Sequence, residues 1–266
     1  MIKEVTSLQN ALVKEVLQLQ EKSRVRKRLS SCVVEGQREI SLAQKANYDI
    51  QTLLYCEEIF DISKQNNFNL ETSKLVKISK DVYQKIAFRD TTEGVIAILK
   101  TKKLDLEMIV FKRKDPLILV AEAPEKPGNI GALLRTADAA NVDAVIIANP
   151  KTDLYNPNII RSSVGCIFTN NIAIGTTEDI IKYLKKNDIQ IFCAALTASK
   201  LYHTINYKDS CAIVVGTEAT GLSTEWLENS TQNVIIPMQG QIDSLNVSVS
   251  AAILLFEVKR QRNFNK

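Results

Sequence analysis

Histidine is nearly absent from this chain, which has only His203 among its 266 residues. The five cysteines are scattered, contain no C-x-x-C pair, and each lies in or beside an apolar stretch. Because structural zinc sites need four cysteine or histidine ligands at short spacings, the sequence speaks against a bound metal. We expect the cysteines to be buried, reduced thiols, as is typical of cytoplasmic proteins.

Glycine motifs for nucleotide phosphates are also missing. No G-x-G-x-x-G follows an apolar run, and no G-x-x-x-x-G-K-[ST] occurs. The usual sequence signatures of hydride transfer with NAD and of phosphoryl transfer with ATP are therefore missing, and the sequence does not favour either reaction. No apolar run approaches the roughly 20 residues of a membrane span, and the N-terminus has no apolar signal core. We expect neither export nor membrane insertion.

The composition is that of a globular protein with a slight excess of positive charge. Hydrophobic residues make up 45% and charged residues 24%, and the length suffices for two domains with their own cores. Lys and Arg total 34 against 30 Asp and Glu, a net charge of +4. Such a balance permits a nucleic-acid partner without requiring one.

The sequence divides into two parts joined by a charged segment. Residues 1–100 alternate short apolar strands with helices, which predicts a smaller α/β domain. Residues 101–116 are rich in charge and end in Pro116, so they are interpreted as a linker. Residues 117–266 alternate strands and helices more regularly, which predicts a parallel sheet covered by helices on both faces.

Three glycine-containing loops follow apolar strands in the second part: "EKPGNIG", "GTEATGL" and "MQGQIDSLN". In an open parallel sheet, ligands bind at the carboxyl ends of the strands, where backbone N–H groups and helix N-termini converge. The loops therefore predict one ligand site built largely from backbone. The alternative is that each glycine only ends a helix or makes a turn.

These loops lie in three longer motifs: "EKPGNIGALLRTADAANVDAVII", "AIVVGTEATGLS" and "VIIPMQGQIDSLNVSVSAAI". In this order they resemble the motifs of the SpoU (TrmH) family, RNA ribose 2′-O-methyltransferases of the SPOUT superfamily that use S-adenosylmethionine. The resemblance implies a C-terminal α/β domain with a deep trefoil knot and an N-terminal RNA-binding domain similar to a ribosomal protein. It also implies a homodimer with the final helix in the interface, where Val249, Ile253 and Phe256 form an apolar face.

The resemblance assigns site residues as well. Arg135 matches the motif-one arginine; because a guanidinium is not easily deprotonated, we expect it to hold the target phosphate and stabilise charge on the ribose oxygen. The other catalytic candidates are Asn129, Glu218 and Asn246. The expected cofactor-binding residues are Leu196, Gly216, Ile236, Met238, Ser244 and Leu245. Thr217 and Ala219 depart from the family's usual motif around the glutamate.

RNA contacts are expected from basic residues in the first part. The apolar spacing predicts a helix from Ser7 to about Lys27, and this helix ends in a basic cluster, comprising Lys22, Arg24, Arg26, Lys27 and Arg28. Such a cluster suits phosphate contacts, although a charged helix end can also be simply solvated. In "RSSVG", Arg161 and Ser163 are further RNA-binding candidates.

The favoured function is S-adenosylmethionine-dependent methylation of a ribose 2′-hydroxyl, in large-subunit (23S) rRNA more than in tRNA, because many rRNA-modifying members have a separate N-terminal domain. The alternatives are a tRNA 2′-O-methyltransferase and a non-catalytic RNA-binding or ribosome-assembly protein. A cytoplasmic location is expected, with neither a membrane nor DNA as partner.

Overall fold

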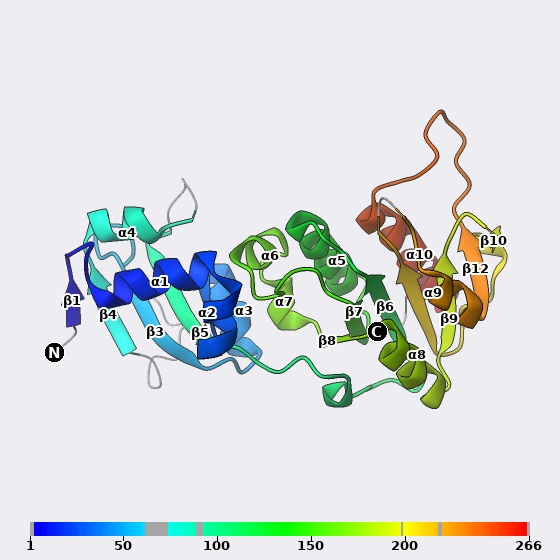
Figure 1. Cartoon of the computed structure of the whole chain (residues 1–266), viewed down its shortest axis with the longest axis horizontal. Helices are drawn as coiled ribbons and strands as arrows, with labels where there is room; N and C mark the ends of the chain where they lie inside the picture. The colour runs from blue at the N-terminus through cyan, green and yellow to red at the C-terminus, as the bar shows by residue number, and fades with distance from the viewer. Residues whose placement is uncertain (1–2, 62–73, 89–92, 198, 218–219, 265–266) are drawn as a thin grey trace. The chain divides into compact units, whose positions relative to one another are not determined.

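The chain forms two compact units in a computed structural model, which describes residues 3–61, 74–88, 93–197, 199–217 and 220–264 (Figure 1). Unit 1 comprises Met1–Lys103 and Asp153–Thr169, and unit 2 comprises Leu104–Thr152 and Asn170–Lys266. Unit 2 thus begins inside the segment 101–116 expected as a linker. Asp153–Thr169, which the sequence assigned to the second domain, packs with unit 1 instead.

Unit 1 is built on a mixed five-stranded sheet with the order β1-β4-β3-β5-β2. Its strands are β1 Lys3–Val5, β2 Ser31–Glu35, β3 Ile50–Tyr55, β4 Lys74–Ile78 and β5 Val95–Lys100. β4 pairs in parallel with β1 and β3, whereas β5 runs antiparallel to β2 and β3. The expected smaller α/β unit is therefore present in this part of the chain.

The helices of unit 1 are α1 Ala11–Glu21, α2 Ser23–Leu29, α3 Gln37–Lys45, α4 Lys80–Ile86, α6 Pro157–Ser162 and α7 Cys166–Thr169. α1 and α4 bury apolar side chains against the sheet, among them Val16, Leu19 and Tyr83. The sequence predicted one helix from Ser7 to about Lys27. The chain instead leaves helical geometry at Lys22, which has extended backbone angles, and so forms two helices.

The segment 153–169 is bound to the rest of unit 1 by buried polar contacts. Arg26 Nε donates to Asp153 Oδ2 at 2.5 Å, and Arg26 Nη1 donates to the carbonyl oxygens of Leu19 (2.7 Å) and Gln20 (3.1 Å). The Tyr155 hydroxyl accepts from the Lys102 amide at 3.1 Å. α6 begins at Pro157, preceded by Asn156, whose side chain accepts from the Asn158 amide.

Unit 2 contains a seven-stranded sheet with the order β10-β12-β9-β11-β6-β7-β8, in which neighbouring strands pair in parallel. The strands are β6 Leu117–Glu122, β7 Ala144–Ala148, β8 Ile172–Gly175, β9 Gln190–Ala194, β10 Ser199–Leu201, β11 Cys211–Val215 and β12 Gln232–Ile235. The parallel α/β fold expected from the alternation of apolar strands and helices is confirmed.

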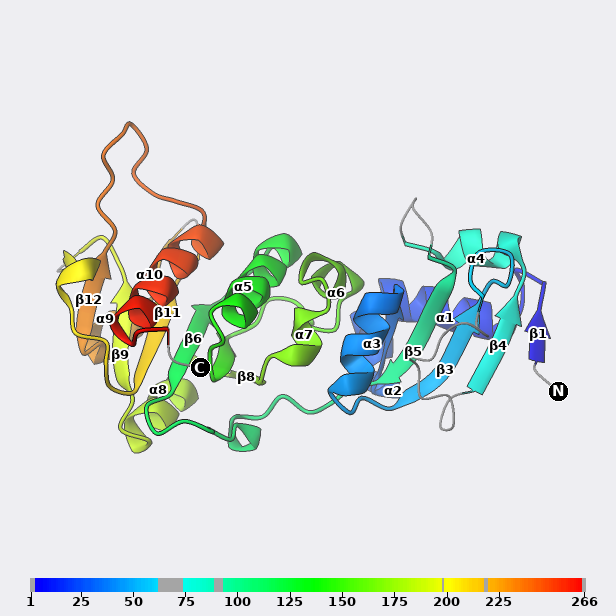
Figure 2. The same ribbon diagram turned by 180° about the vertical axis from the view of Figure 1, so that it is seen from behind.

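The helices of unit 2 are α5 Pro127–Ala139, α8 Thr177–Lys186, α9 Thr224–Asn229 and α10 Val247–Gln261, with short 3-10 turns η2 Leu106–Met108 and η3 Tyr202–Thr204. α8 and α9 pack on one face of the sheet, where Ile180, Leu184 and Trp226 join the buried strand residues. α5 and α10 pack against each other, and Figure 2 shows α10 in front of β11. Among the described helices, none has the length and apolar character needed to cross a membrane.

Candidate functional site

The carboxyl edge of the unit 2 sheet is shaped by sharp turns directly after its strands. Ala123 follows β6 and Asn149 follows β7, and both adopt a left-handed backbone with φ of 44° and 47°. This conformation is unfavourable for alanine, whereas asparagine tolerates it. The Ala123 amide donates to the Ala148 carbonyl and the Asn149 amide to the Gly175 carbonyl, so the strand ends remain linked. The turns hold the following loops close to the sheet.

The loop after β11 closes tightly on itself at Gly216. The Thr217 amide donates to the Gly221 carbonyl at 3.0 Å, and the Gly221 amide donates to the Thr217 carbonyl at 3.2 Å. A Cβ atom on residue 216 would lie only 2.3 Å from the Gly221 carbonyl carbon and oxygen. Only glycine fits here, because those atoms belong to backbone that cannot move without opening the loop. Glycine at 216 is thus explained by a close approach of two chain segments.

Asn129 and Asn246 meet although they stand 117 residues apart in the sequence. The Asn246 Nδ2 donates to Asn129 Oδ1 at 3.2 Å, and Asn246 Oδ1 caps α10 by accepting from the Ser248 amide at 2.9 Å. Asn129 lies in the first turn of α5. The contact therefore brings the N-terminal ends of two long helices together, and their aligned dipoles favour an anion near that point.

Arg135 lies on α5, six residues beyond Asn129, and its side chain is exposed. Six residues correspond to about 9 Å along a helix axis. A guanidinium group so placed is open to an anionic ligand from solvent. Glu218, the remaining catalytic candidate, lies outside the described residues.

The expected cofactor-binding residues fall on two parts of unit 2. Gly216 directly follows β11, and Leu196, with 70% of its surface exposed, comes two residues after β9. β9 and β11 are paired neighbours, so these two strand ends are adjacent. The other candidates, Ile236, Met238, Ser244 and Leu245, belong to the segment between β12 and α10, called the arm here. Figures 1 and 2 both show the arm extending away from the sheet.

Glu122 was not among the residues selected from the sequence. It ends β6 with only 7% of its surface exposed and accepts three hydrogen bonds: from Thr177 Oγ1 (3.1 Å), the Ser223 amide (2.8 Å) and Ser223 Oγ (2.7 Å). Its signal in the sequence was an acidic residue closing the otherwise apolar run "LILVAE". Burying a carboxylate costs free energy unless it is hydrogen-bonded, so these three hydrogen bonds are what allows Glu122 to be buried at the strand end.

The basic cluster in unit 1 divides into exposed and buried members. Arg24, in the first turn of α2, and Lys27 and Arg28, in its last turn, are exposed. Arg26, predicted as a phosphate contact, is 4% exposed and is engaged by Asp153 and two backbone carbonyls. The prediction for Arg26 is therefore corrected: its guanidinium stabilises the packing of unit 1 and is not available at the surface.

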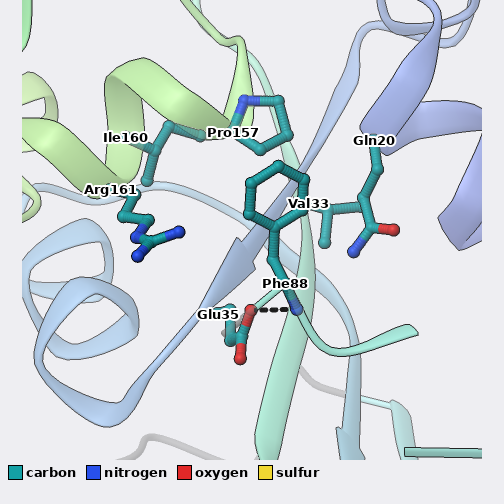
Figure 3. A pocket seen from close by; sticks show the side chains of 7 residues that line it. All are labelled: Gln20, Val33, Glu35, Phe88, Pro157, Ile160 and Arg161. Carbon is teal, nitrogen blue, oxygen red and sulfur yellow. Dashed lines mark hydrogen bonds between the residues drawn. The ribbon is translucent and has the colours of Figure 1, made fainter. Parts of the chain in front are cut away.

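Arg161 and Ser163 have different surroundings. Figure 3 shows Arg161 at a small hollow in unit 1, which is also lined by Gln20, Val33, Glu35, Phe88, Pro157 and Ile160. The Phe88 ring is 39% exposed there, and its backbone amide donates to Glu35 Oε2 at 2.7 Å. Ser163 is fully buried, and its hydroxyl donates to the Ile160 carbonyl at 3.0 Å. Ser163 therefore stabilises the end of α6 and offers nothing to a surface ligand, contrary to its predicted RNA contact.

All five cysteines are buried and free. Burial raises the pKa of Cys193 and of Cys211 to about 12, and for Cys211 the nearby Arg262 opposes part of that rise. His203 is exposed in η3. The described part of the chain contains no group of three His, Cys, Asp or Glu residues able to hold a metal ion.

Three features characterise the class of protein to which this chain belongs: the parallel sheet, the glycine loop after β11, and the joined N-termini of α5 and α10. The chain belongs to the SpoU rRNA Methylase family, whose model matches residues 116–256, more than half of the chain. The model of the MRM3-like substrate binding domain matches residues 10–97.

Similar proteins extend over nearly the whole chain. The 23S rRNA (guanosine(2553)-2′-O)-methyltransferase RlmP of Bacillus subtilis is 28% identical over 97% of this chain and 100% of its own length. A solved RNA 2′-O ribose methyltransferase shares 38% identity and a TM-score of 0.84, covering 98% of this chain and 99% of its own. An rRNA methyltransferase from Sinorhizobium meliloti, solved with S-adenosylmethionine bound, shares 28% identity and a TM-score of 0.88, covering 97% and 98%.

Proposed function

We propose that this protein transfers a methyl group from S-adenosylmethionine to a ribose 2′-hydroxyl of large-subunit (23S) rRNA. The observation that carries the proposal is the contact between Asn129 and Asn246, which joins the N-termini of α5 and α10. That arrangement suits a substrate with anionic phosphates and a reaction in which an oxygen gains negative charge. The relative RlmP, named for 2′-O-methylation of 23S rRNA, supports the choice of substrate.

The residues fit S-adenosylmethionine as the cofactor. The backbone around Gly216 approaches itself so closely that a side chain is excluded, which leaves peptide groups to face a ligand. In this proposal Leu196 and Gly216 contact the cofactor from the strand ends. The arm folds back over them, so that Ile236, Met238, Ser244 and Leu245 complete the pocket. The cofactor supplies an activated methyl group on its sulfonium, and the chain's own residues supply alignment.

Arg135 is the central catalytic residue in this proposal. A ribose hydroxyl is a poor nucleophile near neutral pH, so the protein must align it and stabilise the charge that develops on its oxygen. The guanidinium of Arg135 stays protonated and can pair with a phosphate of the target nucleotide. Asn129 and Asn246 orient the ribose from the two helix ends. Glu218, which matches the glutamate of the second motif, is assigned the task of holding Arg135 or the active-site loop in place.

Unit 1 binds the RNA in this proposal. Arg24, Lys27 and Arg28 offer exposed cations to phosphates, and Arg161 offers another beside the exposed ring of Phe88. An aromatic ring next to an arginine can stack an unpaired base while the cation contacts its phosphate. The match of residues 10–97 to a substrate binding domain supports this assignment.

The proposal includes two further features of the family. One is the deep trefoil knot of residues 117–266, together with a ribosomal-protein-like fold of residues 1–100 joined through 101–116. Similarity to solved relatives over 97–98% of this chain supports it. The other is a homodimer through α10, whose outer face carries Val249 and Phe256 with 46% and 42% of their surfaces exposed.

The deciding experiment is transfer of a labelled methyl group from S-adenosylmethionine to 23S rRNA and to tRNA from cells lacking the gene. The 2′-O-methylated linkage is mapped by its resistance to alkali. We expect label at one site in 23S rRNA. Label in tRNA instead would show that tRNA, and not 23S rRNA, is the substrate. A protein that binds the RNA without binding S-adenosylmethionine would be a non-catalytic RNA-binding protein.

The role of Arg135 is tested by Arg135→Ala. We expect kcat to fall by about 10²–10³-fold, the range found when one charge-stabilising donor is removed, with the dissociation constant for S-adenosylmethionine unchanged. Lys186→Ala, which removes an exposed positive charge from the last turn of α8, is the matched control and should keep full activity. Unchanged turnover in Arg135→Ala would exclude the assigned role.

A further inference from the structure

A directional chain of hydrogen bonds runs across the carboxyl edge of the unit 2 sheet. Asn149 Nδ2 donates to Thr177 Oγ1 at 2.9 Å, and Thr177 Oγ1 donates to Glu122 Oε1 at 3.1 Å. From the other side, Ser223 donates to Glu122 through both its amide and its hydroxyl. The donors all point toward Glu122, which as a carboxylate has only acceptor sites.

The members of this chain come from four strand ends that are adjacent in the sheet. Glu122 ends β6, Asn149 follows β7, and Thr177 opens α8 two residues after β8. Ser223 closes the loop that starts at Gly216 after β11 and directly precedes α9. The hydrogen bonds therefore link the end of β11 to that of β6 through Ser223 and Glu122, and the ends of β6 and β7 each to the start of α8 through Thr177.

The centre of this network is buried, whereas its outer members Asn149 and Ser223 are exposed. Glu122 is 7% and Thr177 is 4% exposed, so water competes weakly for their hydrogen bonds. The backbone on the other side of Glu122 is also fixed, because Ala123 is held in a left-handed conformation at φ 44°. Such strain persists only where the surrounding structure determines it, and it is common near functional sites.

We propose that Glu122 is the positioning residue, in the methyl-transfer reaction, for the described part of the loop after β11, residues 216–217 and 220–223. The loop is fixed at its start by the close approach at Gly216 and at its end by the bonds from Ser223 to Glu122. Glu122 touches neither substrate nor cofactor and acts through the loop. This inference rests on the proposed function, because it assigns the loop to S-adenosylmethionine.

The experiment compares Glu122→Ala, Glu122→Gln and Ser223→Ala. Alanine removes all three acceptor contacts, so the dissociation constant for S-adenosylmethionine should rise about tenfold to a hundredfold. Glutamine keeps an oxygen for the Ser223 amide and turns its NH2 toward two hydroxyls that can accept. The dissociation constant of Glu122→Gln for S-adenosylmethionine should therefore stay within about threefold of the wild-type value. Ser223→Ala keeps the amide contact and should give a rise of about threefold to tenfold. Glu178→Ala, which removes an exposed carboxylate next to Thr177, is the control and should have no effect.

Hydrogen exchange without ligand provides a second readout. Peptides covering residues 220–226 should exchange faster in Glu122→Ala than in the wild type and in Glu122→Gln. Wild-type affinity together with wild-type exchange in Glu122→Ala would overturn the proposal, as would equal losses for glutamine and alanine. If Glu122→Ala does not fold, wild-type affinity and exchange in Ser223→Ala would overturn it. A wild-type protein that binds no S-adenosylmethionine would refute the proposed function, while the exchange data would still decide whether Glu122 holds the loop.

Discussion

Replacing Asp153 with alanine should destabilise unit 1 by about 3 kcal/mol and leave unit 2 unaffected. Asp153 accepts from Arg26 across 127 residues of sequence, and the two side chains are 10% and 4% exposed. Removing one partner of a buried ion pair typically costs about 3–5 kcal/mol, because the remaining charge is left uncompensated. We expect the lower end, since the carbonyl oxygens of Leu19 and Gln20 still contact the guanidinium.

The chain offers separate probes for its two units. Trp226, its single tryptophan, is fully buried in unit 2, so its fluorescence follows unfolding of that unit. Hydrogen exchange of peptides from α1, β2 and β5 follows unit 1. With a urea dependence of about 2 kcal/mol per molar, the loss of 3 kcal/mol lowers the midpoint of unit 1 by about 1.5 M. The tryptophan transition should stay in place.

Two companion variants sharpen this test. Asp153→Asn keeps an acceptor for Arg26 and should cost less than Asp153→Ala. Combining Asp153→Ala with Arg26→Met removes the uncompensated charge and should recover part of the loss. A loss below about 1 kcal/mol in Asp153→Ala, or an equal loss in both units, would refute the reasoning that this pair secures the segment 153–169 in unit 1.

Two further predictions concern the sheet edge and the thiols. Gly216→Ala should weaken S-adenosylmethionine binding by about a hundredfold or more in a calorimetric titration, because its Cβ would lie 2.3 Å from the Gly221 backbone. Wild-type affinity in this variant would contradict the role assigned to the close approach at Gly216. Burial raises the pKa of Cys193 and Cys211 to about 12. At pH 8 only about one in 10⁴ of these two thiols is then a thiolate, so Ellman's reagent should react with them only after unfolding. Prompt labelling of Cys193 or Cys211 in the native protein, located by peptide mapping, would contradict this account.

Local patterns in the sequence predicted the elements of unit 2 well. A run such as "LILVAE" is too short for a buried helix and is bounded by breakers, which indicates a strand, and β6 occupies it. The amphipathic run "EDIIKYLKKNDI" similarly indicated a helix, and α8 occupies most of it. The strand order could not be read in this way, because it depends on crossovers between distant segments.

The errors arose where a residue's partner is distant in sequence. Arg26 stands in a row of basic residues that look alike along the chain, and only Asp153 distinguishes it. Ser163 appeared available beside Arg161, yet it is buried within unit 1, where α6 packs on β2. Glu122 shows the converse case: its acceptor role depends on Thr177 and Ser223, so no neighbouring residue revealed it.

Unit 1 is made from two stretches of chain, and this discontinuity constrains the order of folding during synthesis. When Lys103 leaves the ribosome, the first stretch still lacks α6, α7 and the carboxylate for Arg26. Residues 104–152, which belong to unit 2, must emerge before the missing piece does. The N-terminal unit therefore cannot be completed first, as a domain made of one continuous stretch can. An isolated fragment of residues 1–103 would expose Arg26 and the surfaces that α6 and α7 cover, so dissecting this protein requires a fragment in which 153–169 is joined to the first stretch.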